Sequence, residues 1–188
     1  MPYSPQGSLN LDWQWDEFDP NPDSFNIAGD YVYSIKHRLI DFDFWNAKCL
    51  ASAEFIDLAR DFSAEFRTIP VAFKYPNGEF SQKQYFYVLW KDWHSLIDLD
   101  KSSYIVSEDL HCARVKDKYF QDHWHMQEIS QFVVDPQKDP HRHIFRSIDL
   151  RNEAICSESF MRMCKQRKMK GIEFVPIEDA KLIDPFGA

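Results

Sequence analysis

Glycine is scarce in this chain: 188 residues contain five, and no two lie close enough to form a glycine-rich phosphate-binding loop. The Rossmann and P-loop nucleotide-binding classes are therefore excluded. The sequence also lacks the G-x-S-x-G motif of serine hydrolases, the HExxH motif of zinc proteases and the calcium loop of EF-hands. These absences do not exclude an enzyme whose catalytic groups come together only in the fold.

Long apolar runs and a secretory leader are also missing. No apolar run approaches the roughly 20 residues of a membrane-spanning helix. Residues 1–10 show neither the basic region nor the apolar core of a signal peptide. The cysteines show no C-x-x-C spacing, so we expect reduced thiols that pack as small hydrophobic residues. They are Cys49, Cys112, Cys156 and Cys164. The sequence therefore predicts a cytoplasmic protein without membrane contact.

Basic residues are outnumbered, 22 Lys and Arg against 30 Asp and Glu, which gives a net charge of -8. Nucleic acid and anionic lipid are not expected as partners, because phosphate binding needs a basic stripe. A basic protein partner would suit this charge, since opposite charges accelerate encounter. Aromatic residues make up 16% of the chain. Most are expected in the core, and some could anchor a partner.

The composition, 44% hydrophobic and 28% charged, is typical of one globular domain. Residues 1–30 contain four prolines and are expected to be irregular. Residues 31–188 are expected to form a single domain. A first short strand is predicted at 31–35. The chain shows no internal repeat.

The clearest predicted helix begins after Ser52, a typical N-cap residue, with Glu54 in its first turn. Apolar residues then recur with the spacing of one helical face, which indicates an amphipathic helix. That stripe consists of Phe55, Leu58, Ala59, Phe62 and Phe66.

Two strands, 69–75 and 83–90, are predicted on either side of Asn77-Gly78. This pair favours a type I′ hairpin turn, in which both central residues have positive φ. Pro70 lacks a backbone donor and so places the first strand at an edge of the sheet. Further strands are predicted at 103–107 and 113–119, while 123–134 fits either a helix or a strand. Hairpins with isolated helices between them predict an α+β fold with a mainly antiparallel sheet and a few packed helices.

The last quarter of the chain predicts a strand, a helix and a closing strand. Residues 143–148 have the strand pattern, and Ser157 is expected to cap a helix that buries Phe160. Gly171 is expected to end that helix in the left-handed conformation. Alternating apolar residues at 172–176 then indicate the closing strand.

Three stretches of this region, in their order and spacing, resemble the C-terminal signature of a bacterial family of immunity proteins. That family, the eleventh of its kind, protects toxin-producing cells against their own polymorphic toxins. The stretches are Phe145-Arg146-Ser147-Ile148, Ile155-Cys156-Ser157-Glu158-Ser159-Phe160 and Met169-Lys170-Gly171-Ile172-Glu173-Phe174-Val175-Pro176. Weaker matches begin at 85–90 and 97–102, so the resemblance covers the second half of the chain.

The resemblance implies an inhibitor that acts by binding, not an enzyme. It would form a tight stoichiometric complex with a cognate toxin domain and need no cofactor. The matched residues are interpreted as fold determinants, so the resemblance does not locate the binding surface. A structural adaptor of a secretion system remains an alternative.

The segment Trp13 to Asp19 is the candidate partner-binding site. Its indoles, Trp13 and Trp15, could serve as anchors, while Asp16, Glu17 and Asp19 could steer a basic partner. The alternative is that these aromatic residues simply pack an N-terminal strand onto the core.

The competing hypothesis is a metal-dependent or hydrolytic enzyme that uses histidines. His123 and His125 form one H-x-H pair, and His141 and His143 form another. On a strand, such a pair places both imidazoles on one face, within reach of one zinc ion. No carboxylate or thiolate has ligand spacing to either pair, so we assign no metal site. The paired carboxylates, common in an acidic chain, are given no catalytic role.

Overall fold

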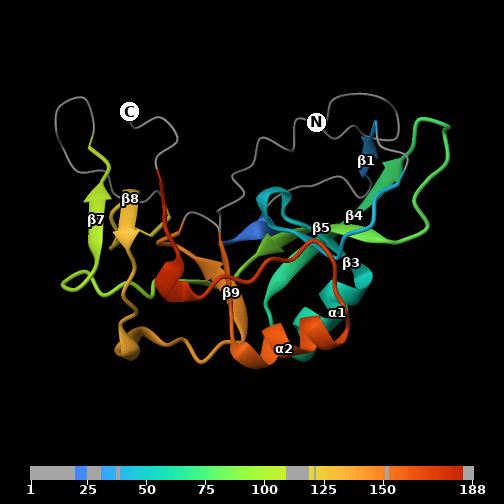
Figure 1. Cartoon of the computed structure of the whole chain (residues 1–188). Coiled ribbons are helices and arrows are strands. Elements are labelled where there is room, and N and C mark those ends of the chain that lie inside the picture. Colours follow the sequence, from blue (N-terminus) through green and yellow to red (C-terminus); the bar gives the residue numbers. More distant parts are fainter. Residues whose placement is uncertain are drawn as a thin grey trace.

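The structure, a computed structural model, describes residues 20–24, 31–36, 39–108, 119–120, 122–150 and 153–183. Within them, five strands form a mixed sheet in the order β1-β4-β5-β3-β2 (Figure 1). A three-stranded sheet has the order β10-β9-β6, and β7 pairs with β8. The strands of the first sheet are β1 (Tyr31–Ser34), β2 (Phe44–Trp45), β3 (Leu50–Ser52), β4 (Phe66–Lys74) and β5 (Tyr85–Trp90). The others are β6 (Trp93–His94), β7 (Ser103–Val106), β8 (Met126–Gln131), β9 (Ile144–Ser147) and β10 (Ala154–Cys156).

Two α-helices, α1 (Ala53–Asp61) and α2 (Glu158–Gln166), occur in the described part of the chain. The described part also contains four short 3-10 helices: Pro22–Ser24, Asn46–Lys48, Pro136–Lys138 and Ile177–Asp179. Most strand pairs are antiparallel, but β1 with β4 and β6 with β9 are parallel. The predicted α+β class with a mainly antiparallel sheet is confirmed. The proposed boundary at residue 30 stays a prediction.

Both helices begin where their capping residues predict. Ser52 Oγ accepts a hydrogen bond from the Phe55 amide at 3.2 Å, and Ser157 Oγ accepts one from the Phe160 amide at 3.3 Å. Each bond satisfies an amide that the first helical turn leaves without a partner. The helix α1 is shorter than its apolar stripe, however. It ends at Asp61, and Phe66 belongs to β4.

The predicted hairpin is confirmed, and its turn differs from the expected type. Strands β4 and β5 are antiparallel, with Val71 opposite Tyr85. The Gly78 amide donates to the Tyr75 carbonyl at 2.9 Å, and Gly78 has φ of 88° while Asn77 does not have positive φ. Pro76 explains the difference: its ring fixes φ near -65°, which suits the first central position of an ordinary turn. One left-handed residue, Gly78, then closes the turn.

The prediction that β4 lies at a sheet edge is wrong, because β4 lies between β1 and β5. Its ladder with β1 covers only Val71 to Lys74, however, and Pro70 lies one residue before that ladder begins. A proline is tolerated there because β1 needs no hydrogen bond from it.

The end of α2 also differs from the prediction. The left-handed residue after α2 is Lys168, with φ of 54°, not Gly171. Gly171 has φ of 77° at a later position, where a Cβ atom would lie 3.0 Å from both the Phe42 Cβ and the Phe44 carbonyl oxygen. Residues 172–176 form no strand. Their alternation reflects side-chain packing alone, since Ile172 and Phe174 contact the core.

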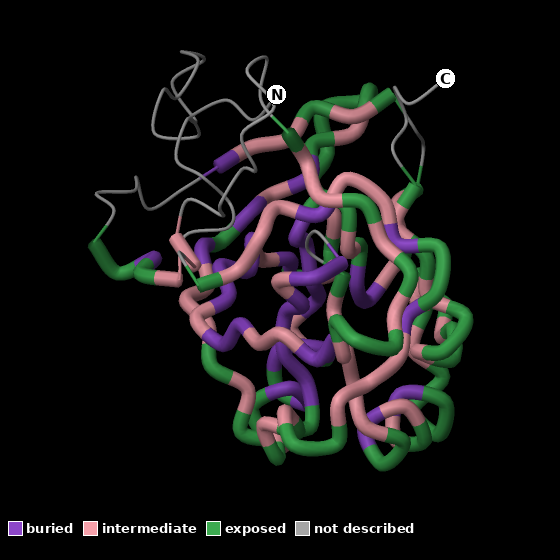
Figure 2. Tube along the Cα trace, turned by 90° about the vertical axis from the view of Figure 1, so that its left-hand side faces the viewer, coloured by how far each residue is buried: buried purple, intermediate pink, exposed green. Residues whose placement is uncertain are grey.

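Both helices cover the same face of the five-stranded sheet (Figure 1). Phe55 of α1 stacks on Phe44, with ring centroids 4.4 Å apart, and Phe160 of α2 meets Phe55 edge-on at 5.9 Å. The opposite face carries a second cluster that includes Tyr85 and Phe73. A third cluster packs under β7 and β8. Buried residues run through the middle of the molecule, and the exposed ones lie mainly in the loops around it (Figure 2).

The remaining strand predictions divide three ways. The strand at 31–35 is confirmed as β1, the strand at 103–107 as β7, and 143–148 as β9. The ambiguous stretch 123–134 contains the strand β8. The strand predicted at 113–119 falls almost entirely outside the described residues.

Candidate functional site

The candidate partner-binding residues Trp13, Trp15, Asp16, Glu17 and Asp19 lie outside the described residues. Their role therefore stays a prediction. The part of the chain that the structure describes offers other candidates.

The histidine pairs lack the strand geometry that the metal hypothesis assumed. His123 and His125 precede β8, and His141 and His143 precede β9. The His141 side chain is 89% exposed and lies 3.6 Å from Asp139. His143 instead contacts the hydroxyl of Ser157 at 3.0 Å, at the start of α2. In the described ranges, no group of three His, Cys, Asp or Glu residues is arranged to hold a metal ion.

One histidine that the sequence reading overlooked does have a carboxylate partner. His94 Nε2 lies 2.5 Å from Asp92 Oδ1, and Arg142 Nε lies 3.2 Å from the other carboxylate oxygen. Arg142 also contacts Glu65 at 2.8 Å. The D-x-H spacing was the only sequence signal for this pair. Because Asp92 is almost fully buried and contacts both His94 and Arg142, the group ties β6 to the loop before β9.

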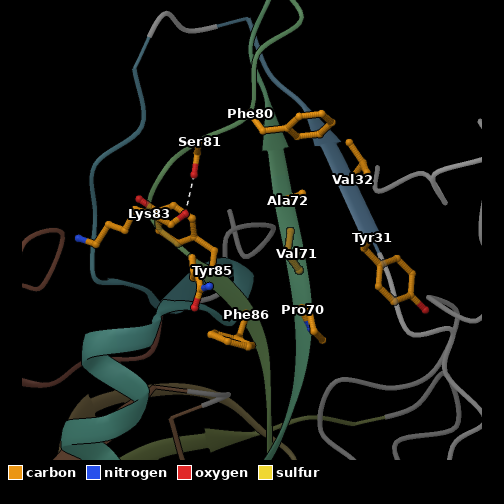
Figure 3. A pocket seen from close by; sticks show the side chains of 11 residues that line it. Tyr31, Val32, Pro70, Val71, Ala72, Phe80, Ser81, Lys83, Tyr85 and Phe86 are labelled. Carbon is orange, nitrogen blue, oxygen red and sulfur yellow. Dashed lines mark hydrogen bonds between the residues drawn. The ribbon is translucent and has the colours of Figure 1, made fainter.

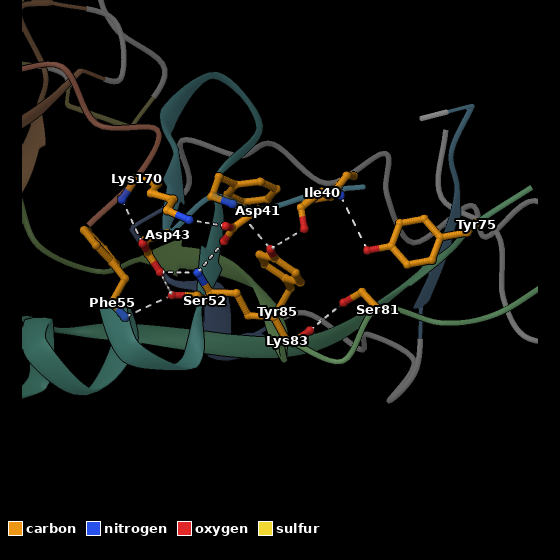
Figure 4. A network of polar contacts seen from close by, with 11 residues as sticks. Ile40, Asp41, Asp43, Ser52, Phe55, Tyr75, Ser81, Lys83, Tyr85 and Lys170 are labelled. Carbon is orange, nitrogen blue, oxygen red and sulfur yellow. Dashed lines mark hydrogen bonds and ion pairs between the residues drawn. The ribbon is translucent and has the colours of Figure 1, made fainter. Parts of the chain in front are cut away.

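A second polar network surrounds Asp43 (Figure 4). Its carboxylate is 4% exposed and accepts from Lys83 Nζ at 2.6 Å and from Ser52 Oγ at 2.7 Å. The other oxygen accepts from the Lys170 amide at 2.8 Å. The Asp43 amide in turn donates to the Lys170 carbonyl at 2.7 Å. Asp43 lies directly before β2. Its buried carboxylate thus joins this position to the start of α1 through Ser52, to the loop before β5 through Lys83 and to the segment after α2 through Lys170.

The charges in this network shift one another's pKa values. Burial by itself raises the pKa of Asp43, but the hydrogen bonds from Lys83, Lys170 and Ser52 outweigh it and hold that pKa below its usual value. The Lys170 and Lys83 ammonium groups lower the pKa of the exposed Asp41 in the same way. For Lys83, burial lowers the pKa, and the contact with Asp43 more than reverses this. The network is therefore ionised at neutral pH and acts as an anchor between segments.

Two of the described thiols, Cys156 and Cys164, are not poised for catalysis. Cys49 and Cys164 are buried and Cys156 is partly buried. Burial raises the pKa of Cys156 to about 11 and that of Cys164 to about 12. A nucleophilic cysteine needs a lowered pKa, so these two thiols are packing residues, as the sequence predicts.

An open groove of about 570 Å³ lies beside β1 and β4 (Figure 3). Phe80 stands at its upper end with 52% of its surface exposed. The Lys83 ammonium points away from the groove towards Asp41 and Asp43 (Figures 3 and 4). Exposed aromatic residues beside an apolar groove are typical of protein-binding surfaces. The apolar lining residues are Tyr31, Val32, Pro70, Val71, Ala72, Phe80, Tyr85 and Phe86.

Comparison with known families decides the assignment. The model of the immunity protein family Imm11 matches residues 14–179. The chain belongs to this immunity protein family. The match extends well beyond the second half, to which the resemblance read from the sequence was confined. No curated protein matches the chain significantly. Among the described residues, no helix is long and apolar enough to cross a membrane.

In this Imm11 family member, the three stretches that resemble the family signature lie in β9, at the start of α2 and in the segment after α2. The Phe145-Arg146 strand is β9, Ser157 caps α2, and Gly171 lets the following segment approach β2 closely. Ser157 caps α2 and Phe174 packs against the core, as the sequence predicts, whereas Gly171 does not end α2.

Proposed function

We propose that this Imm11 family member is a cytoplasmic immunity protein that binds a cognate bacterial toxin and neutralises it in a tight stoichiometric complex. The observation that carries the proposal is the family match across residues 14–179. Inhibition by binding needs neither a cofactor nor a catalytic group. It needs a preformed surface that is complementary to the toxin.

Two properties of the chain support such a role. The net charge of -8 would accelerate encounter with a basic toxin domain. The apolar groove beside Phe80 offers a concave surface for side chains of a partner. The segment with Trp13, Trp15, Asp16, Glu17 and Asp19 stays part of the proposed interface, with aromatic anchors beside steering charges.

The test begins with the neighbouring genes, where a toxin gene should lie immediately upstream. Co-expression of this protein should restore growth to cells that produce the toxin domain. Size-exclusion chromatography with light scattering should show a complex of fixed stoichiometry. If neither protection nor a complex is observed, the proposal is wrong.

The two competing classes predict different results in the same experiments. A metal-dependent enzyme would carry stoichiometric zinc, iron or manganese when the protein is purified without a histidine tag. A secretion-system adaptor would bind the toxin but leave the cells unprotected. Protection by an equimolar complex in protein free of metal distinguishes the proposed immunity function from both.

A further inference from the structure

The sheet of β7 and β8 has one edge along which no other described strand pairs. On the far side of β8, the Ile129 amide donates to the Leu182 carbonyl at 2.8 Å, and the Ile129 carbonyl accepts from the Leu182 amide at 3.1 Å. On the far side of β7, the described residues provide no further strand. Strand β7 is therefore a sheet edge, and in Figure 1 it lies on the outer side of β8.

The bonds of Ile129 show which backbone groups of β7 point outward. Tyr104 lies opposite Ile129 in the register. Because Ile129 directs both its amide and its carbonyl at Leu182, Tyr104 and Ile129 form a non-hydrogen-bonded pair. In such a pair, the backbone groups of the two residues point away from each other. The amide and the carbonyl of Tyr104 therefore point to the open edge.

The same alternation places the backbone groups of Val106 on this edge. The Ser107 amide donates to the His125 carbonyl at 2.8 Å, so position 107 faces the β8 side and Val106 before it faces away. Along the open edge, the amides and carbonyls of Tyr104 and Val106 have no backbone partner among the described residues.

Strand β7 lacks three features that keep sheet edges from pairing: a proline, a charge and a bulged residue. Its sequence, Ser103–Val106, contains neither proline nor a charged residue. Both register shifts in its ladder skip a residue of β8, Gln127 or Ser130, so the extra residues belong to β8 and β7 is regular. Ile105, on its solvent side, is 53% exposed. The edge is thus a regular template to which an extended backbone can add.

The chemistry of this edge selects an extended segment as its partner. Unpaired amides and carbonyls at the spacing of a strand match the backbone of another strand, and extended peptides bind exposed sheet edges in this way. On one face, side chains of such a segment would lie beside Ile105. On the other face they would lie beside Tyr104 and Val106, which pack against the core. Apolar and β-branched residues suit both sets of neighbours.

Two properties favour a toxin over a second copy of this chain as the source of that segment. A four-residue strand offers far less than the roughly 1,000 Å² that a stable interface of its own requires. Each copy also carries a net charge of -8, which opposes association between copies. A toxin that is held by further surfaces needs the edge only as one part of its interface.

We infer that an extended segment of the cognate toxin adds to the open edge of β7 and bonds to the backbone of Tyr104 and Val106. The added segment would extend the sheet of β7 and β8 to three strands. The inference rests on the proposed function and adds to it one position of the interface and the conformation of the toxin there.

Amide hydrogen exchange, resolved to single residues by NMR, tests this contact directly. In the free protein, the Tyr104 and Val106 amides should exchange fast, while the Ser107 amide, already bonded to His125, should exchange slowly. The partner to add is the toxin domain encoded by the neighbouring gene, made inactive by substitution. Its binding should slow exchange at both outward amides by at least about tenfold more than at Ser107.

Affinity for the same toxin domain, measured by isothermal titration calorimetry, tests the edge with variants. Val106→Pro removes an outward amide and should weaken binding by about tenfold or more. Ile105→Lys places a charge at the edge and should weaken binding about tenfold; because this side chain is already exposed, the variant tests the edge even where the proline variant unfolds. Ile183→Lys is the matched control, since Ile183 is 71% exposed and lies outside β7, and it should change affinity by less than about twofold.

If the two outward amides exchange as fast in the complex as in the free protein, the inference is wrong and the immunity function stands. The same holds if Ile105→Lys binds like the wild type or if the control loses as much affinity. Slow exchange at both amides in the free protein would also overturn the inference, because a second copy or another part of the chain would then occupy the edge already. If the wild-type protein does not bind the toxin domain at all, the proposed function itself fails.

Discussion

Replacing Asp43 with asparagine removes a buried charge and almost nothing else, since the two side chains have the same shape. The Asp43 carboxylate is 4% exposed and accepts from Lys83 Nζ, Ser52 Oγ and the Lys170 amide. All three partners are donors. An asparagine must direct its NH2 group at one side of this set, so at least one bond is lost and replaced by two facing donors.

The magnitude follows from these contacts. Loss of a hydrogen bond to a charged group costs about 1.5–3 kcal/mol, and removal of one member of a buried ion pair costs about 3–5 kcal/mol. Lys83 keeps its contact with Asp41 at 3.3 Å and its side chain is 28% exposed, so the full cost of a buried unpaired charge does not apply. We therefore expect Asp43→Asn to lower the free energy of unfolding by about 2–4 kcal/mol.

Urea unfolding followed by tryptophan fluorescence measures this loss. The matched control is Asp57→Asn on α1, whose side chain is 72% exposed and lies 4.0 Å from Arg60. That change should alter stability by less than about 0.5 kcal/mol. A loss below about 1 kcal/mol in Asp43→Asn, or an equal loss in the control, would refute the view that Asp43 is the anchor.

The pH dependence gives a second readout of the same group. Because the pKa of Asp43 is lowered in the folded protein, its contribution is fully present above the ordinary value of 3.8 and is lost as the pH falls through the folded value. The stability difference between wild type and Asp43→Asn should therefore be largest above pH about 4 and should shrink in more acidic solution. A difference that stays constant down to pH about 2 would contradict the assignment.

Three further changes test other parts of the structure. Phe160→Ala should cost about 3–5 kcal/mol in urea unfolding, because this 1% exposed ring packs between both helices. Gly171→Ala should destabilise more than Gly78→Ala, since both have positive φ but only Gly171 has neighbours within 4 Å of a new Cβ; equal losses would argue against close packing there. The double change Asp16→Lys and Glu17→Lys should leave thermal stability nearly unchanged, but it should slow association with the toxin and make it less sensitive to salt; unchanged kinetics would remove this segment from the interface.

Local signals in the sequence were enough to predict both helices. Ser52 and Ser157 cap α1 and α2, because capping depends only on a side chain and an amide three residues away. The β4–β5 hairpin was also predictable, since Gly78 closes a turn between two apolar runs. The C-terminal stretches likewise sufficed to identify the family.

The errors arose where a distant contact overrode a local pattern. Pro70 favours an edge strand, yet the parallel partner β1 arrives from a separate part of the chain and begins one residue later. Gly171 was interpreted as the end of α2, but Lys168 performs that role. The position favours glycine because its φ is 77° and a Cβ would lie only 3.0 Å from the Phe42 Cβ and the Phe44 carbonyl oxygen.

The sequence by itself determined both helices, the β4–β5 hairpin, the fold class and the family, because periodicity, capping and motif order are properties of neighbouring residues. Only the tertiary structure decided which side chains meet. Asp43 binds the Lys170 amide 127 residues away, and Arg146 reaches Asn46 across 100 residues. Such contacts depend on how strands are ordered in the sheets and on how closely segments approach. Asn46 donates to Glu153 across 107 residues for the same physical reason, since the two side chains meet only after the segment before β10 has packed beside the turn that follows β2.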